Sequence, residues 1–202
     1  MMHAVVTPEA DAALIVVDVQ NDFCPGGALG VDEGDAVVPV LNQWIEAFRR
    51  AGRPVVYTQD WHPADHASFK EQGGIWPVHC VQGTDGAAFH PDLKVDGHVF
   101  RKAFASDKEG YSGFDGYLAE DPDAAGPPSD VDLASWLKQQ GVRKVYVGGL
   151  TTDYCVRATV LDAIKNGFEA VFIAAASRPV NVEPGDEEKA IEDMKAAGAR
   201  VV

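Results

Sequence analysis

Short hydrophobic runs, each about the length of a strand, recur along the chain. They are rich in Val and Ile and lack the alternation of hydrophobic and polar residues that marks a half-exposed strand. The runs cover residues 12–18, 54–60, 97–102, 144–150, 170–176 and 199–202. Runs of this kind are typical of strands that are buried on both faces of a parallel sheet.

Helix-like stretches separate several of these runs and cover residues 35–52, 129–141, 152–167 and 184–198. In the first stretch, hydrophobic residues recur along one helix face, at Val38, Leu41, Ile45 and Phe48. Strands that alternate with helices predict parallel pairing through crossover connections. We therefore expect an α/β fold, a three-layer α/β/α sandwich around a mostly parallel sheet of roughly six strands.

Domain organisation is expected to be simple. The length of 202 residues suits a single domain over residues 1–202, and no repeat is visible. Residues 119–130 read as a surface connection. Residues 61–96 form a longer stretch that is dense in His, Trp, Gly and Pro, and so long a connection in a compact domain is usually functional.

Charge and cysteine content narrow the classes of function. The chain has 17 basic and 31 acidic residues, a net charge of −14, which argues against nucleic acid or an anionic membrane as partner. An acidic surface also simply keeps proteins soluble. Three cysteines without a C-x-x-C pair, and a start without the features of a signal peptide, predict a cytoplasmic protein. A neutral or cationic small molecule is the expected partner, and homo-oligomerisation stays open.

Reactive side chains follow four of the predicted strands. Asp18 ends the first, Asp60 and His62 follow the second, Lys102 ends the third, and Cys155 begins the helix after the fourth. Ligands of open parallel sheets bind at the carboxyl ends of the strands. We therefore expect these side chains to share one site.

Cys155 is the candidate nucleophile. In the first turn of a helix, the helix dipole and unpaired N–H groups are expected to lower its pKa and to hold an oxyanion. Asp18 could accept the thiol proton, and the ammonium of Lys102 could stabilise the thiolate. The alternatives are a buried structural thiol and a structural ion pair.

Asp60, His62 and His79 are the candidate metal ligands. Two histidines and one carboxylate leave coordination positions open, as in catalytic metal sites. The spacing alone does not choose among histidines, and His66 and His90 are rival third ligands. Phe23 and Trp76 stand near these residues in the sequence and could sandwich a flat ring, with core packing as the alternative. A resemblance to a known family, described next, adds Tyr111 to the candidate ring contacts.

The strings that carry this resemblance span most of the chain. They are VDVQNDFCPGGAL (17–29), TQDWHPADHASF (58–69), WPVHCVQGTDGAAFHP (76–91), RKAF (101–104), YSGFDG (111–116) and GLTTDYCVRATVLDA (149–163). Together they resemble the nicotinamidase (pyrazinamidase) branch of the isochorismatase-like, or cysteine hydrolase, family. The resemblance implies the Rossmann-type topology of that family and an amidohydrolase activity on nicotinamide.

Roles for individual residues follow from the resemblance. It implies a catalytic trio of Asp18, Lys102 and Cys155, and metal ligation by Asp60, His62 and His79. It implies substrate contacts for Phe23, Trp76 and Tyr111, and an oxyanion hole formed by the N–H groups of Thr151 and Cys155 beside a cis bond between Leu150 and Thr151. In some relatives a histidine near His66 also binds the metal.

The implied reaction converts nicotinamide and water to nicotinate and ammonia through a cysteine thioester. The resemblance also implies a role in NAD salvage. The pyridine ring would be oriented by one divalent metal ion, Zn, Fe or Mn, which all accept such ligands. Pyrazinamide would be a second substrate. Three other readings stay open: a relative that cleaves ureido compounds or isochorismate, a binding module without catalysis, and a thiol oxidoreductase.

Overall fold

The computed structural model describes residues 7–122, 124 and 126–202 of the chain. Residues 1–6, where the predicted domain begins, lie outside the described residues. The strands are β1 (Ala12–Val17), β2 (Val55–Asp60), β3 (His98–Lys102), β4 (Tyr117–Leu118), β5 (Lys144–Leu150), β6 (Glu169–Arg178) and β7 (Arg200–Val201). The helices are α1 (Val37–Arg50), α2 (Leu133–Gln139), α3 (Arg157–Lys165) and α4 (Asp186–Ala196).

Within the described residues, the strands form one sheet in the order β4-β3-β2-β1-β5-β6-β7. Every neighbouring pair is parallel except β3 and β4, which are antiparallel. The prediction of an α/β fold with a mostly parallel sheet is confirmed. The sheet has seven strands rather than roughly six, because the two-residue edge strand β4 is too short to leave a hydrophobic pattern in the sequence.

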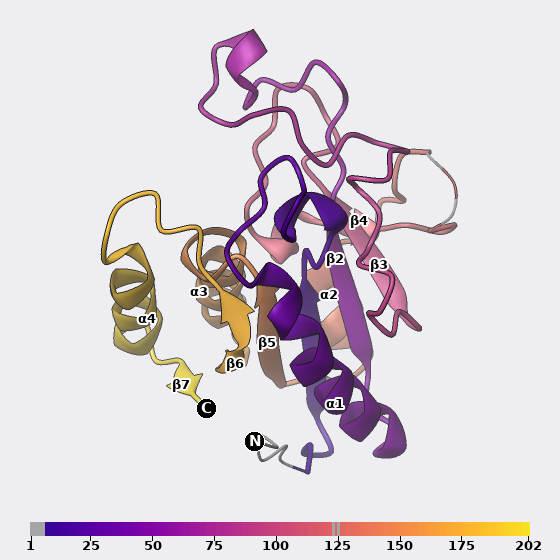
Figure 1. Cartoon of the computed structure of the whole chain (residues 1–202). Coiled ribbons are helices and arrows are strands. Elements are labelled where there is room, and N and C mark those ends of the chain that lie inside the picture. The colour runs from indigo at the N-terminus through magenta and orange to yellow at the C-terminus, as the bar shows by residue number, and fades with distance from the viewer. Residues whose placement is uncertain (1–6, 123, 125) are drawn as a thin grey trace.

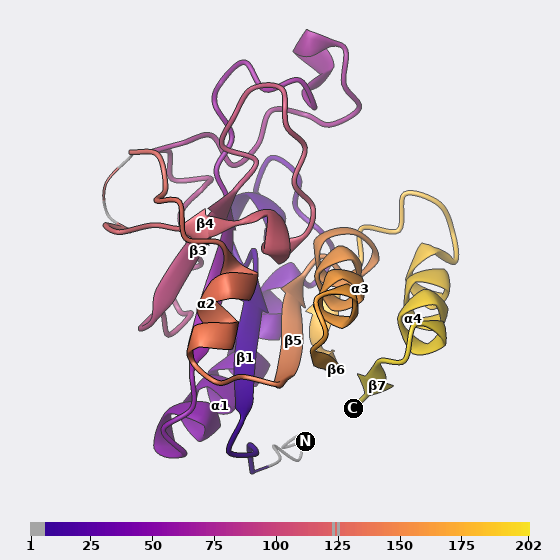
Figure 2. The ribbon, with the colours of Figure 1, turned by 180° about the vertical axis from the view of Figure 1, so that it is seen from behind.

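Helices cover both faces of the sheet, as Figures 1 and 2 show from opposite sides. Helix α1 packs on one face through the residues that the helical spacing picked out, and Leu41, Ile45 and Phe48 are fully buried. The other face packs against α2, α3 and α4. Alternate residues of β1 therefore enter opposite cores, Leu14 and Val16 on the α1 side and Ile15 and Val17 on the other. This explains why the strand is hydrophobic without alternation.

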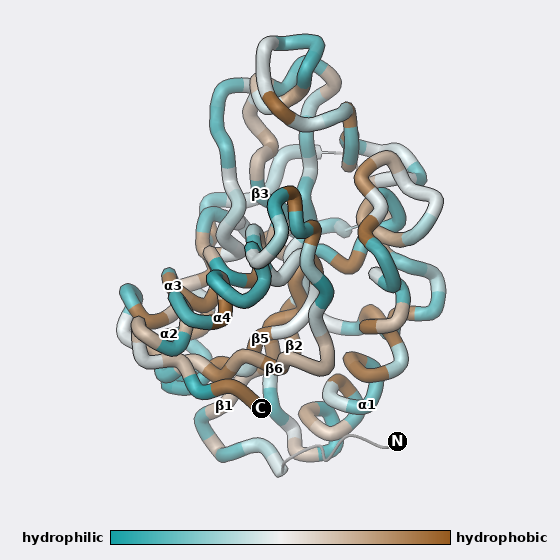
Figure 3. The backbone as a smooth tube through the Cα atoms, turned by 60° about the vertical axis from the view of Figure 1, so that its left-hand side comes forward, coloured by the Kyte–Doolittle hydropathy of each residue, from teal (hydrophilic) through white to brown (hydrophobic). Residues whose placement is uncertain are grey.

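The direction of strand order changes between β1 and β5. Strands β2 and β3 follow on one side of β1, and β5, β6 and β7 lie on the other. A reversal of this kind opens a crevice at the carboxyl ends of the strands, where open α/β sheets bind ligands. The segment between β2 and β3 rises beyond this edge of the sheet (Figure 1). Hydrophobic residues gather along the central strands β2, β5 and β6 (Figure 3), so the core lies below that crevice.

Every helix in the described part of the chain is too short or too polar to cross a lipid bilayer.

Candidate active site

Four strand ends bring their reactive side chains together at the crevice. Asp18 follows β1, Asp60 ends β2, Lys102 ends β3, and Cys155 lies in a π-helical turn, Thr152–Val156, directly after β5. The ammonium of Lys102 lies 2.9 Å from Asp18 Oδ2 and 3.5 Å from the sulfur of Cys155, and it also pairs with Asp60. The expectation that these side chains converge is met.

The backbone at Asp18 is held in an uncommon conformation. Its φ is 47°, in the left-handed region that residues other than glycine rarely adopt. The hydroxyl of Thr58 donates to Asp18 Oδ1 at 2.6 Å. Asp18 Oδ2 accepts no hydrogen bond from the described residues, although it lies beside the ammonium of Lys102. Apart from this ion pair, Oδ2 is available to accept a proton.

Burial sets the charges of this cluster. Desolvation raises the pKa of Asp18 to about 6, although the charge of Lys102 opposes it. Desolvation alone would lower the pKa of Lys102, but the carboxylates of Asp18 and Asp60 outweigh it and raise this pKa well above its usual value. Lys102 is therefore a permanent cation, and Asp18 has the near-neutral pKa of an efficient general base.

The expected lowering of the Cys155 pKa is wrong. The residue Cys155 is only 6% exposed, and desolvation raises the pKa of its thiol well above the usual value, against the opposing charge of Lys102. A helix terminus acts weakly beside the loss of hydration, which removes most of the stabilisation of a thiolate. Cys155 therefore rests as a thiol and needs a base to become a nucleophile.

The turn that presents Cys155 depends on a close approach between β1 and β5. A Cβ on Gly149 would lie 2.1 Å from the carbonyl oxygen of Val17, so only glycine fits there. The peptide bond between Leu150 and Thr151 is cis, as the resemblance implied. Both Thr151 and Cys155 line the same pocket, which places the two expected oxyanion-hole residues together.

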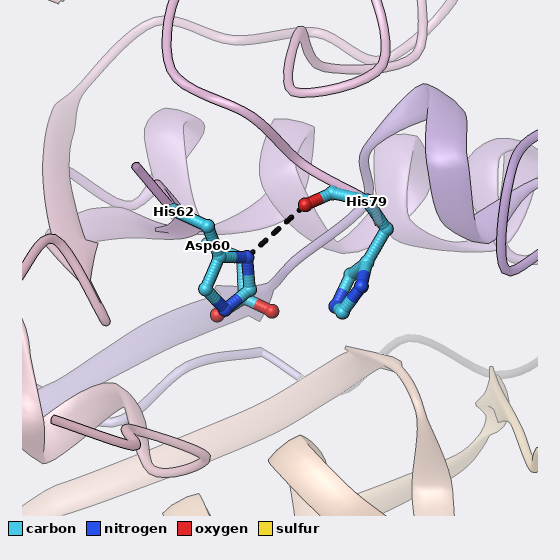
Figure 4. Close-up of side chains that lie close together, drawn as sticks. All are labelled: Asp60, His62 and His79. Atoms are coloured by element: carbon cyan, nitrogen blue, oxygen red, sulfur yellow. Dashed lines mark hydrogen bonds between the residues drawn. The ribbon is translucent and has the colours of Figure 1, made fainter. Parts of the chain in front are cut away.

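Asp60, His62 and His79 form a second cluster beside the first (Figure 4). One ligand atom from each lies within 4.8 Å of the others, and all three residues are buried. Nδ1 of His62 donates to the carbonyl oxygen of His79 at 3.2 Å, and Nδ1 of His79 donates to that of Pro77 at 2.7 Å. Each Nε2 therefore carries the lone pair, which is the tautomer that binds a metal ion.

The donor set suits a divalent metal ion. Desolvation lowers the pKa of His62 to about 4, so its ring is neutral and able to coordinate. Although desolvation opposes it, Lys102 keeps the pKa of Asp60 below its usual value, so its carboxylate is charged. Two imidazoles, each held by a backbone carbonyl at Nδ1, and one carboxylate fit a catalytic metal site with open positions.

The rival histidines do not join this cluster in the described part of the chain. The ring of His66 lies near that of His62, with centroids 4.5 Å apart, but both of its nitrogens are engaged. Nδ1 bonds the hydroxyl of Ser68 at 2.7 Å, and Nε2 donates to the carbonyl oxygen of Lys108 at 3.0 Å. His90 instead accepts a hydrogen bond from the N–H of Asp92 at its own loop.

One pocket joins the two clusters. The expected ring contacts Phe23, Trp76 and Tyr111 line it, together with Cys155 and the metal-ligand candidates. Asp18 and Lys102 are fully buried behind Cys155. Sequence reasoning missed further lining residues: Leu29, Ser68, Glu109, Gly110, Tyr154 and Val180. Two of these had a signal, since Tyr154 precedes Cys155 in the helix turn and Val180 follows the end of a predicted strand.

Trp76 is held in place by its neighbours. Its indole N–H donates to the hydroxyl of Tyr111 at 3.0 Å, and its ring meets that of Tyr154 edge-on with centroids 5.0 Å apart.

Replacement of Tyr111 by phenylalanine would remove the hydrogen bond that holds Trp76. Because one neutral hydrogen bond contributes about 1 kcal/mol, we expect Tyr111→Phe to raise KM for the ligand of this pocket about threefold to tenfold, with kcat little changed. Steady-state kinetics check this, with Tyr117→Phe in β4, away from the pocket, as control. An unchanged KM would contradict the role of the hydroxyl.

Comparison with known proteins gives independent findings. A model of the isochorismatase domain matches residues 12–202. The nicotinamidase of Escherichia coli is 40% identical over 93% of this chain and 92% of its own length. The structure of the pyrazinamidase of Pyrococcus horikoshii in complex with zinc superposes with a TM-score of 0.83, at 47% identity over 95% of this chain and 98% of that one. That of PnC1 from L. infantum in complex with nicotinate superposes at 0.82, with 34% identity over 98% and 96%.

Proposed function

This chain belongs to the isochorismatase family, and on that premise we propose that it hydrolyses nicotinamide to nicotinate and ammonia. The proposal depends on one observation: two clusters meet at one pocket. The first is Cys155 with its base Asp18 and the cation Lys102, and the second is the set of candidate metal ligands that includes His79. Relatives and structural neighbours named as nicotinamidases and pyrazinamidases support the same substrate class. Pyrazinamide is proposed as a second substrate.

Nucleophilic attack begins with a proton transfer. Asp18 Oδ2, which accepts no hydrogen bond from the described residues, takes the proton of the Cys155 thiol. Lys102, 3.5 Å from the sulfur, stabilises the thiolate as it forms. The thiolate then attacks the amide carbon and gives a tetrahedral oxyanion, to which the N–H groups of Thr151 and Cys155 are proposed to donate.

Collapse of this intermediate releases ammonia. The protonated Asp18 returns its proton to the departing nitrogen, which leaves a thioester on Cys155. Asp18, again a carboxylate, then takes a proton from water as the water attacks the thioester carbon. The sulfur leaves as a thiolate and recovers its proton from Asp18, so the site returns to its starting state.

The remaining lining residues hold the substrate. Phe23 and Trp76 are proposed to contact the faces or edges of the aromatic ring. A divalent ion bound by Asp60, His62 and His79 would offer an open coordination position to the ring nitrogen and so orient the amide. Zinc, iron and manganese all suit these ligands, and the neighbour from Pyrococcus horikoshii is a zinc complex.

Removal of one metal ligand tests whether the metal ion serves to place the substrate. We expect His79→Ala to lose bound metal and to raise KM by at least about tenfold, because the substrate then loses its anchor. Metal content by elemental analysis and steady-state kinetics check this, with His90→Ala as the matched control outside the cluster. Full activity in a metal-free His79→Ala protein would contradict the placement role.

The function itself is tested by ammonia release. The metal-loaded chain should release one ammonia per nicotinamide and produce nicotinate in equal amount. Parallel assays with a ureido compound and with isochorismate should show no comparable turnover. Turnover of either of these, without ammonia from nicotinamide, would assign the chain to another branch of the family.

We infer a cytoplasmic setting and a place in NAD salvage from the same likeness. The acidic charge of −14 is compatible with a neutral substrate such as nicotinamide.

A further inference from the structure

Three polar residues follow the catalytic base in the sequence, and the proposed chemistry uses none of them. We propose that two of them, Gln20 and Asp22, are positioning residues that hold the backbones of Asp60 and Cys80 so that the metal ligands converge. The proposal rests on the proposed function only in taking Asp60, His62 and His79 as those ligands. It assigns a task to the loop after β1 that is separate from proton transfer by Asp18.

Gln20 brackets the residue Asp60. Its side chain is fully buried, and its amide N–H donates to the Asp60 carbonyl oxygen at 2.9 Å while its Oε1 accepts from the Asp60 N–H at 2.9 Å. The second amide proton goes to the carbonyl oxygen of Ala87 at 2.9 Å. The side chain thus acts on Asp60 as a neighbouring strand would, and ties it to the loop that follows His79.

Asp22 reaches the residue directly after His79. Its Oδ2 accepts the N–H of Cys80 at 2.7 Å, and its Oδ1 accepts that of Ala28 at 3.1 Å. The carbonyl oxygen of Cys80 in turn accepts the N–H of His62 at 3.0 Å. One peptide segment at Cys80 therefore links Asp22 to both metal-bearing histidines.

The backbone at Cys80 needs this support. Its φ is 47°, a conformation that residues other than glycine rarely adopt unless the surroundings impose it. The direction of the His79 side chain depends on that turn. An N–H held by a carboxylate forms a charge-assisted hydrogen bond, which is stronger than a neutral one.

Gly86 leaves room for the carboxylate. A Cβ at this position would lie 2.2 Å from Asp22 Oδ2, closer than any real contact. An alanine at position 86 would therefore push the carboxylate away from the Cys80 N–H without changing either partner. This gives a second, independent way to disturb the same bond.

The neighbouring Asn21 provides a matched comparison. Its side-chain amide donates to the carbonyl oxygen of Asp85 at 2.8 Å, so it ties the same two loops together. This side-chain bond of Asn21 ends six residues after His79, whereas Gln20 and Asp22 each make at least one bond to a ligand residue or to its immediate neighbour. If the loop served only general stability, the side chains of Asn21 and Asp22 would matter alike.

Zinc titration of the metal-free full chain tests the proposal. We expect Asp22→Ala to raise the Kd for zinc by about tenfold to a hundredfold, the usual cost of losing a partner that orients metal ligands. Gln20→Met and Gly86→Ala should act in the same direction, and Asp22→Asn, which keeps one acceptor oxygen, should be intermediate. Asn21→Ala should stay within about threefold of the parent. Alkylation of Cys155 in the metal-free proteins should keep its parent rate.

Two results would overturn the proposal. One is an equal zinc Kd for Asp22→Ala and Asn21→Ala; the other is a matching change in Cys155 alkylation, which would indicate general loosening. If Asp22→Ala does not fold, unchanged zinc binding in both Asp22→Asn and Gly86→Ala would overturn it as well. Because these measurements use no nicotinamide, they stand apart from the proposed function: a parent chain that binds zinc without releasing ammonia would reject the function alone.

Discussion

Replacement of Cys155 by alanine is expected to lower kcat for nicotinamide by about 10⁴-fold or more. The covalent route depends on this sulfur, and neither of the other two cysteines lines the pocket. Binding of zinc should be unchanged, since Asp60, His62 and His79 are untouched. Ammonia release measures the first effect, and calorimetric titration with zinc and with nicotinamide measures the second.

Cys24→Ala is the control for this experiment. Cys24 is also buried, and desolvation raises its pKa to about 11, yet it lies outside the pocket. The control should keep kcat within about threefold of the parent. Ammonia release by Cys155→Ala at a tenth of the parent rate would reject the thioester mechanism, because water would then be attacking the amide directly.

The convergence of the four strand-end residues was predictable from the sequence. Each hydrophobic run was recognisable by itself, and parallel strands end at the same edge of a sheet. The order β3-β2-β1-β5 then makes Lys102, Asp60, Asp18 and the turn with Cys155 direct neighbours. No knowledge of side-chain contacts was needed for this step.

The third metal ligand was not predictable in the same way. The stretch 61–96 has no hydrophobic period, so nothing local chooses His79 over His66 or His90. Its path depends on hydrogen bonds from distant residues, such as that from the Cys80 N–H to Asp22. Only the resemblance to known enzymes selected the histidine that the structure places beside Asp60.

Tertiary contacts also explain one wrong prediction and two features that the sequence did not show. The pKa of Cys155 was judged from its helix, but burial by distant elements raises it. The stretch 119–130 is a mostly exposed connection without helix or strand in its described residues, as predicted, but the sequence did not show that the buried guanidinium of Arg101 donates to its carbonyl oxygens at Pro122 and Ala124. Edge strand β4 precedes this stretch and pairs with only two residues of β3. Contacts between remote segments decide these features, and no local pattern encodes them.

Replacement of Asp18 by asparagine is expected to lower kcat/KM about 10³-fold, within the range usual for loss of a general base. Asparagine tolerates the left-handed backbone at this position and nearly matches aspartate in shape. Its amide oxygen can still accept the Thr58 hydroxyl, but it cannot take the proton of Cys155. Steady-state kinetics at saturating zinc give the effect, and thermal unfolding checks that the fold is kept.

Thr58→Val tests whether Thr58 acts through the pKa of Asp18. The Thr58 hydrogen bond lowers the pKa of Asp18, which desolvation raises to about 6, so its loss should raise that pKa further. Only the carboxylate form accepts a proton, and activity should therefore fall more at pH 6 than at pH 8. An activity that falls equally at pH 6 and pH 8 would mean that Thr58 acts on the shape of the site and not on the pKa of Asp18.

The result that would contradict the role of Asp18 is an Asp18→Asn variant that keeps more than half of the parent kcat/KM. The buried thiol would then ionise without Asp18, and Asp18 would have no part in the mechanism.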